Sequence, residues 1–83
     1  MKIQVRYFAS LRETLGISGE SVDTLCTDVA GLRAQLVARG GAHAECLAPG
    51  RAVRVAVNQV MAQDSTPLVP DGEVGFFPPV TGG

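Results

Sequence analysis

The residues of this chain with the clearest capacity for chemistry are its last eight, which read FFPPVTGG (residues 76–83). Pro78 and Pro79 each fix a φ angle and exclude a helix, so the chain is expected to leave the preceding segment extended and stiff. The β-branched residues Val80 and Thr81 favour extension as well. The pattern predicts a stiff, extended C-terminal tail.

The two glycines that end this tail indicate what it could do. Gly82 and Gly83 add no side chains, and the α-carboxylate of Gly83 is ionised at neutral pH because its reference pKa is about 3.5. Residues 80–83 reach about 13–14 Å when extended. Such a tail could carry a carboxylate into a channel too narrow for a Cβ atom. Since ordering a segment costs about 1–2 kcal/mol per residue, prolines that order it in advance favour insertion into a partner.

The rest of the sequence holds no recognised catalytic motif, such as a P-loop, GxGxxG or GxSxG. The single histidine, His43, is expected at the surface or at a loop edge, which argues against a metal site or a histidine-based catalytic group. Cys26 and Cys46 match neither a CxxC motif nor a disulfide framework, so they predict two small buried side chains in a reducing compartment. The carboxylates are expected at caps, turns and solvent-facing positions, where no two form an acid–base pair.

Composition predicts one soluble domain over residues 1–83, with residues 78–83 as its tail. The chain is 46% hydrophobic and 18% charged, which is typical of a globular protein. Its net charge is −1 and its basic residues are scattered, so no nucleic-acid partner is expected. No apolar run approaches the ~20 residues of a membrane span, and the alternating start MKIQVRYF does not resemble a signal peptide. We therefore expect a cytoplasmic protein without a membrane contact.

Two antiparallel strands are expected in the first quarter of the chain. Residues 2–7 alternate strictly and predict a half-buried strand, after which Phe8 lies on the polar side. Residues 9–16 predict a short helical turn with Ser10 as its cap and Gly16 at its end. The segment 20–25 predicts the second strand, with Val22 and Leu25 facing inward.

One long helix is expected next, over residues 27–41. Thr27 or Asp28 would cap it, and its apolar positions recur at helical spacing. The pair Gly40-Gly41 would end it, and Gly31 is an unfavourable residue inside it whose reason the pattern does not reveal. Residues 42–51 predict a loop with at most one helical turn.

Three further strands are expected in the second half. Residues 52–58 predict a strand with valines on one face, and a turn and a short edge segment follow before Pro67. Residues 70–72 predict a turn before the last strand, on which Val74 and Phe76 share one face and Gly75 and Phe77 the other. This order of elements predicts an α+β roll, a mixed sheet packed on one main helix.

The ending FFPPVTGG, together with VNQ at residues 57–59 and RYFASLRETLG at residues 6–16, resembles the small subunits of molybdopterin synthase. These proteins are ubiquitin-like sulfur carriers. The resemblance extends over essentially the whole chain, whereas a bare Gly-Gly ending would indicate only the wider ubiquitin-like group. It implies the β-grasp fold, which agrees with the predicted order of elements.

The resemblance also implies the chemistry of the tail. An activating enzyme would use ATP to adenylate the carboxylate of Gly83, and a sulfur donor protein would convert the adenylate to a thiocarboxylate. The large synthase subunit would bind the tail in its active site and transfer the sulfur to precursor Z, the cyclic pyranopterin monophosphate. This chain would hold no cofactor stably and would act as the sulfur-donating subunit rather than as an enzyme by itself. The family implies a heterotetramer with the large subunits at the centre.

Three apolar residues are candidates for partner binding because the alternation leaves them exposed. We expect Phe8, Met61 and Phe77 to form a patch beside the tail that docks the large subunit and the activating enzyme. Arg12 resembles a family position that contacts the activating enzyme, although a solvated helix residue is the alternative. Phe76 is expected in the core.

Three alternatives remain open at this point. The chain could carry sulfur for thiamine or cysteine biosynthesis, since only the recipient would change. It could be a protein modifier joined to lysines through Gly83, because adenylation precedes both outcomes. It could also be an interaction domain with an inert, frayed tail.

Overall fold

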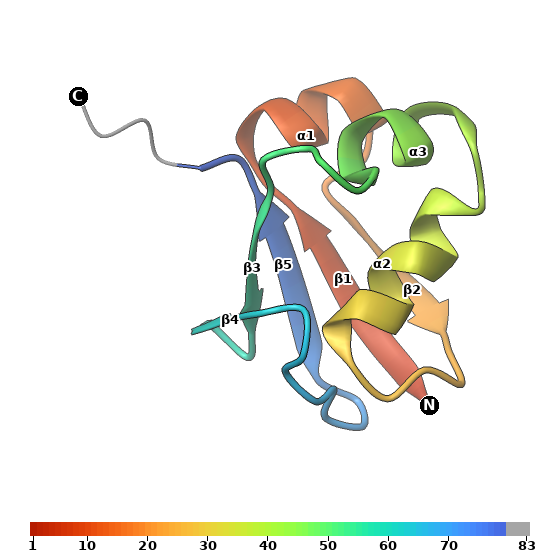
Figure 1. The fold of residues 1–83 in the computed structure, drawn as a ribbon, viewed down its shortest axis with the longest axis vertical. Helices are drawn as coiled ribbons and strands as arrows, with labels where there is room; N and C mark the ends of the chain where they lie inside the picture. Colours follow the sequence, from red (N-terminus) through yellow and green to blue (C-terminus); the bar gives the residue numbers. More distant parts are fainter. Residues whose placement is uncertain (80–83) are drawn as a thin grey trace.

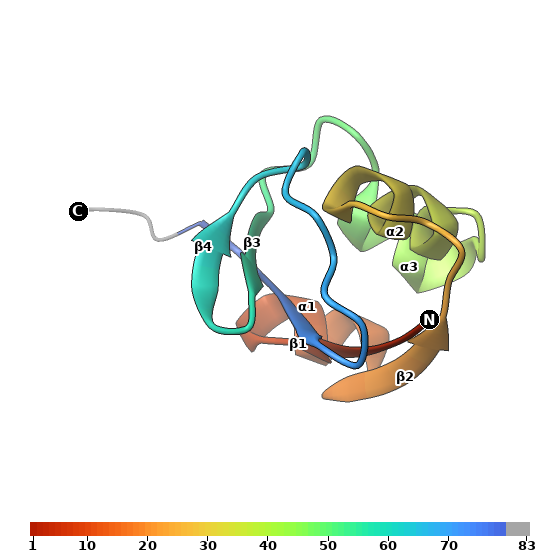
Figure 2. The ribbon, with the colours of Figure 1, turned by 90° about the horizontal axis from the view of Figure 1, so that it is seen from below.

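The computed structural model describes residues 1–79 of the chain, and residues 80–83 lie outside the described part. Five strands form one mixed sheet in the order β2-β1-β5-β3-β4. The sheet curves around α2, while α1 and α3 lie at the end where β1 and β5 finish (Figures 1 and 2). The elements are β1 (Lys2–Tyr7), α1 (Ala9–Leu15), β2 (Gly19–Asp23), α2 (Val29–Val37), α3 (Gly41–Leu47), β3 (Arg54–Val57), β4 (Val60–Ala62) and β5 (Glu73–Phe77).

The first and last strands lie next to each other in the sheet. β1 pairs with β2 in the antiparallel sense and with β5 in the parallel sense. β3 is antiparallel to both β5 and β4. The predicted α+β class is therefore confirmed, with strands β1 and β5 flanked on both sides.

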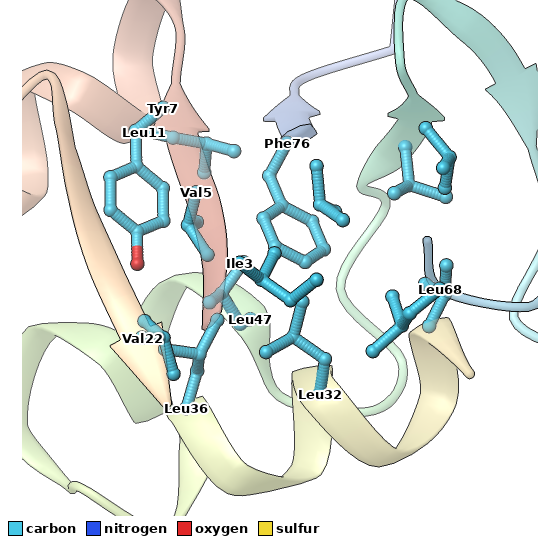
Figure 3. Packing of buried hydrophobic residues seen from close by; sticks show 14 of the residues in the cluster. Ile3, Val5, Tyr7, Leu11, Val22, Leu32, Leu36, Leu47, Leu68 and Phe76 are labelled. Atoms are coloured by element: carbon cyan, nitrogen blue, oxygen red, sulfur yellow. The ribbon is translucent and has the colours of Figure 1, made fainter. Parts of the chain in front are cut away.

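The core follows the alternation of the strands. Ile3, Val5 and Tyr7 of β1 are buried while their neighbours are exposed, and Figure 3 shows Phe76 of β5 pointing toward Leu32 of α2. Burial of each large apolar side chain contributes about 1.5–3 kcal/mol, so this shared cluster is the main force that holds helix to sheet. The cluster consists of Ile3, Val5, Tyr7, Leu11, Val22, Val29, Leu32, Leu36, Cys46, Leu47, Val55, Val57, Leu68, Val74 and Phe76.

The start of α2 explains the glycine inside it. Asp28 caps the helix, because its carboxylate accepts a hydrogen bond of 2.9 Å from the N–H of Gly31. A Cβ atom on Gly31 would lie only 2.8 Å from the Cβ of Cys26. The glycine therefore permits close packing of the preceding loop on the helix.

Two predictions about the first quarter of the chain are wrong. Ser10 does not cap α1, since Phe8 occupies the N-cap position without a side-chain hydrogen bond; Gly16 does end α1, in the left-handed conformation. Leu25 is 98% exposed rather than inward, because β2 ends at Asp23 and the hydroxyl of the buried Thr24 accepts the N–H of Cys26 in a turn.

The predicted loop after α2 contains a further helix, α3, in addition to the predicted main helix and to α1, which the sequence predicted as a short helical turn. Gly40 and Gly41 both have positive φ angles, 74° and 56°, and join the two helices instead of only ending the first. Arg33 of α2 donates hydrogen bonds to the carbonyl oxygens of Leu47 and Ala48, at 2.6 and 3.1 Å, at the end of α3. The sequence pattern missed α3 because its seven residues are too few for a helical period.

A polar network ties α3 to β2 and corrects the expectations for His43 and Glu20. The hydroxyl of Tyr7 donates to Glu20 Oε2 at 2.8 Å, His43 Nε2 lies 2.8 Å from the same oxygen, and Arg39 binds the other carboxylate oxygen. The side chains of His43 and Glu20 are only 15% and 17% exposed. His43 is therefore an interior group of α3, and Glu20 is not a solvated carboxylate.

The network determines the ionisation of Glu20. Burial raises the pKa of its carboxyl, but the hydrogen bonds from Arg39, His43 and Tyr7 outweigh burial and lower that pKa to about 2. Burial, together with the hydrogen bond to Glu20, raises the pKa of the Tyr7 hydroxyl. Glu20 is thus an anion that accepts three hydrogen bonds, which suits a structural role rather than proton transfer.

No helix within residues 1–79 has both the length and the apolar character needed to cross a membrane.

We predict that Phe76→Ala lowers the free energy of unfolding by about 3–5 kcal/mol, because it empties a fully buried site between β1 and α2. The matched variant Phe77→Ala changes a half-buried ring on the other face and should cost about 1 kcal/mol. Urea denaturation followed by circular dichroism measures both. A larger loss for Phe77→Ala would show that the two phenylalanines were assigned to the wrong faces, and equal losses would contradict the placement of Phe76 alone in the core.

We predict a pH-dependent stabilisation by Glu20. Because the pKa of Glu20 in the folded state lies below its ordinary value of 4.5, its contribution is present above about pH 4.5 and disappears as the pH falls toward 2. Glu20→Gln should be less stable at pH 7 and should lose less further stability on acidification.

Urea midpoints at pH 7, 5, 4 and 3 test this prediction, with Glu13→Gln on the exposed side of α1 as the matched control. The control should follow the unmodified protein at every pH. Parallel pH curves for the Glu20→Gln variant and the unmodified protein would contradict the assignment.

Candidate functional site

The tail begins at the end of β5, which lies between β1 and β3. Pro78 and Pro79 follow β5 directly and are half-buried, and Figure 1 shows this segment leaving the sheet at the end that carries α1. Pro78 also lines a shallow groove of about 300 Å³, whose other walls are α1, α3 and residues 51–53. The base of the predicted tail is therefore held by the folded domain.

The remaining predicted tail residues lie outside the described residues. These are Val80, Thr81, Gly82 and Gly83, so the reactive carboxylate of Gly83 stays a prediction.

Phe8 and Phe77 meet on the face of the sheet opposite α2. Their rings are arranged edge to face, with centroids 6.5 Å apart and an interplanar angle of 79°. This contact arises because Tyr7 pairs with Phe76 in the parallel ladder, so the next residues on both strands emerge together on the outer side. The predicted neighbourhood of these two side chains is present at the base of the tail.

A glycine gives Phe8 its position. A Cβ atom on Gly75 would approach Cε2 of Phe8 to 3.0 Å, so the ring lies directly across the backbone of β5. Any larger residue at this position would push the ring away from the sheet. Gly75 therefore shapes the site although it carries no side chain.

Met61 lies on the same face, two strands away. The register pairs Gly75 with Ala56 and Ala56 with Met61, and paired residues of neighbouring strands share a face. We call the face formed by Phe8, Ala56, Met61, Gly75 and Phe77 the outer patch. Phe8 and Met61 are exposed and Phe77 is half-buried, so the patch presents apolar side chains at the surface, which suits a docking surface.

Charged residues border the outer patch. Arg6 pairs with Gly75 in the ladder, and its guanidinium lies 3.5 Å from the carboxylate of Glu73. Arg54 is the ladder partner of Phe77. A partner with a complementary acidic rim would fit this arrangement.

Arg12 occupies a different element from the patch. It lies exposed on α1, and its carbonyl oxygen accepts the N–H of Gly16 at 2.9 Å. This exposed position agrees with a contact to the activating enzyme and equally with a solvated helix residue.

Sequence reasoning missed the Tyr7–Glu20–Arg39–His43 network. The one available indication was that Glu20 and Val22 are two residues apart on a strand and therefore share the inward face.

Within residues 1–79, no group of three His, Cys, Asp or Glu residues could hold a metal ion. Cys46 is buried and Cys26 half-buried, both as free thiols. The described site is the outer patch together with Pro78 and Pro79 at the base of the predicted tail.

The sequence of the chain is similar to known proteins over nearly its whole length. The sequence matches the model of the ThiS family over residues 5–83. It is 38% identical to the molybdopterin synthase sulfur carrier subunit of Escherichia coli K12 and 31% identical to that of Haemophilus influenzae. Each comparison spans 81 residues, which is 98% of this chain and 99% of the relative.

Solved structures agree in fold. SAMP1 from Haloferax volcanii has a TM-score of 0.80 at 24% identity, with 100% of both chains covered, and this likeness bears on the fold alone. A chain from the complex of subunits 1 and 2 of molybdopterin-converting factor of Helicobacter pylori has a TM-score of 0.70 at 26% identity, again over 100% of both chains. These neighbours and the sheet order identify the β-grasp fold. The chain therefore belongs to the ThiS family of ubiquitin-like sulfur carriers, as the resemblance of its tail and early residues implied.

Proposed function

We propose that this chain is the sulfur carrier subunit of a molybdopterin synthase and that the carboxyl group of Gly83 carries the sulfur. The observation that supports this most is the position of β5, which ends with Phe77 in the outer patch and is followed directly by Pro78 and Pro79, where the predicted tail begins. The two curated relatives that match over nearly their whole length are sulfur carrier subunits of this synthase.

The chemistry of the tail follows from the weakness of a carboxylate as an electrophile. An activating enzyme joins the carboxylate of Gly83 to the adenylyl group of ATP and releases pyrophosphate, which gives the carbonyl a good leaving group. A sulfur donor protein then displaces AMP and leaves a thiocarboxylate. In the active site of the large subunit, the sulfur of the thiocarboxylate bonds to precursor Z. Water then hydrolyses the bond between this sulfur and the Gly83 carbonyl, which leaves the sulfur on precursor Z and returns the carboxylate for another cycle.

The folded domain contributes recognition to this reaction. Phe8, Met61 and Phe77 dock the large subunit, and Pro78-Pro79 directs the tail into its active site at a reduced entropic cost. Arg12 is assigned to the activating enzyme. The catalytic residues belong to the partner proteins, and ATP is bound by the activating enzyme rather than by this chain.

The proposed assembly is a cytoplasmic heterotetramer with the large subunits at its centre. The Helicobacter pylori structure supports a large-subunit partner, because it is a complex of subunits 1 and 2 of molybdopterin-converting factor. The proposal assigns residues 1–83 to a single domain and residues 78–83 to the tail that enters the partner.

We predict that incubation with the activating enzyme, ATP and a sulfur donor increases the intact mass by about 16 Da, because sulfur replaces one oxygen of Gly83. Mass spectrometry of the intact chain measures this change, and the variant lacking Gly83 is the control. The thiocarboxylated protein should then convert precursor Z in the presence of the large subunit. An unchanged mass would refute the carrier function.

Two other outcomes of the same experiment identify the alternatives. A mass gain without conversion of precursor Z would indicate sulfur delivery to thiamine or cysteine biosynthesis. Covalent high-mass adducts in cells, absent from the variant lacking Gly83, would indicate a protein modifier.

We predict that Phe77→Asp weakens binding to the large subunit about tenfold to thirtyfold, because it places a charge in the centre of an apolar contact. Isothermal titration calorimetry measures the affinity. Leu25→Asp is the matched control, because it adds the same charge at an exposed leucine. This leucine belongs to the β2–α2 connection, and Figure 1 shows that connection across the molecule from the end of β5. Equal affinities for the two variants would count against the outer patch.

A further inference from the structure

The edge of the sheet next to the outer patch is formed by β4. Among residues 1–79, β3 is the only strand that pairs with β4. The two are joined by Asn58 and Gln59, whose φ angles are 48° and 67°. Two successive positive φ angles are the geometry of a type I′ hairpin turn.

This turn determines which N–H and C=O groups of β4 form hydrogen bonds with β3. In a two-residue hairpin, the residues that flank the turn form a hydrogen-bonded pair, here Val57 and Val60. Hydrogen-bonded and non-hydrogen-bonded pairs alternate along an antiparallel ladder, so Ala56 and Met61 form a non-hydrogen-bonded pair. The N–H and C=O of Met61 therefore point away from β3.

The hydrogen bonds between β3 and β5 independently indicate the same orientation of the Met61 peptide groups. Asn58 N–H donates to the carbonyl oxygen of Glu73 at 2.8 Å, so Asn58 faces β5. Peptide groups on one strand alternate in direction, which places those of Ala56 toward β5 as well and those of Val55 and Val57 toward β4. Met61, the ladder partner of Ala56, thus presents its donor and acceptor at the free edge.

The side chains at this edge are apolar and accessible. Val60 is 68% exposed and Met61 is 54% exposed. Proteins often protect an edge strand with lysine or proline, but residues 60–62 read Val-Met-Ala and contain neither. Among the described residues of β4, Met61 is the one whose N–H and C=O point outward, where another strand could bind them. Met61 also belongs to the outer patch.

We propose that an extended, apolar segment of the large subunit pairs with β4 and continues the sheet, with both hydrogen bonds made by the peptide groups of Met61. This inference rests on the proposed function and names a second mode of contact at the same site. Continuity with the outer patch favours the large subunit as occupant. Pairing of β4 with a second copy would be supported by only two backbone hydrogen bonds, which is too little for a stable dimer.

Amide hydrogen exchange tests the pairing in the intact protein. In the free chain the Met61 amide should exchange fast, while the Val60 and Ala62 amides, bonded to β3, should be protected. Addition of the large subunit should slow exchange at Met61 by at least about tenfold. Unchanged exchange at Met61 in a formed complex would overturn the pairing, and protection in the free chain that rises with its own concentration would assign the edge to a second copy.

Two substitutions separate the peptide group from the side chain. Met61→Ala removes the thioether and keeps the N–H, whereas Met61→Pro also removes the N–H, which the β3–β4 ladder does not use. Met61→Pro should therefore bind the large subunit about fivefold to tenfold more weakly than Met61→Ala.

Equal affinities of two folded variants would overturn the pairing. If the proline variant does not fold, the exchange measurement on the unmodified chain decides. Failure of the unmodified chain to bind the large subunit would instead refute the proposed function itself.

Discussion

The parallel pairing of β1 with β5 is the constraint on which the rest of this structure depends. It places the first and last strands side by side and stacks Tyr7 on Phe76, with ring centroids 6.4 Å apart. Because Phe76 is buried against α2, the residue after it must emerge on the opposite face. The same pairing thus produces a stable core, the contact of Phe8 with Phe77 and a firm base for the tail.

The inner face of the sheet forms the core that stabilises the fold, and the outer face carries the outer patch. The inner face is closed by the apolar cluster with α2 and by the ionised Glu20, which holds α3 through His43. On the outer face, the outer patch is apolar and Gly75 lies under the ring of Phe8, while Arg6 and Arg54 border the patch. Under the proposed function, the outer patch would meet the partner proteins in turn, and its separation from the core would let it bind each of them without disturbing the fold.

Much of the fold could be predicted from local pattern, because a strand repeats every two residues. That period placed Val74 and Phe76 inward and Phe77 outward, whereas the short edge strand was predicted from Pro67, which disfavours a central strand. It failed at α3, because the seven residues from Gly41 to Leu47 are too few to show a helical period. It also failed for Leu25, because a turn ended the strand two residues early.

The sequence by itself determined the composition of the tail, the faces of the strands and the family to which the chain belongs, since these depend on neighbouring residues and on the order of motifs. Only the tertiary structure decided which side chains meet. The ring contact of Phe8 with Phe77, the burial of His43 beside Glu20 and the free peptide groups of Met61 all depend on strand order and register. Strand order and register arise from pairing between segments far apart in the chain, which no local period encodes.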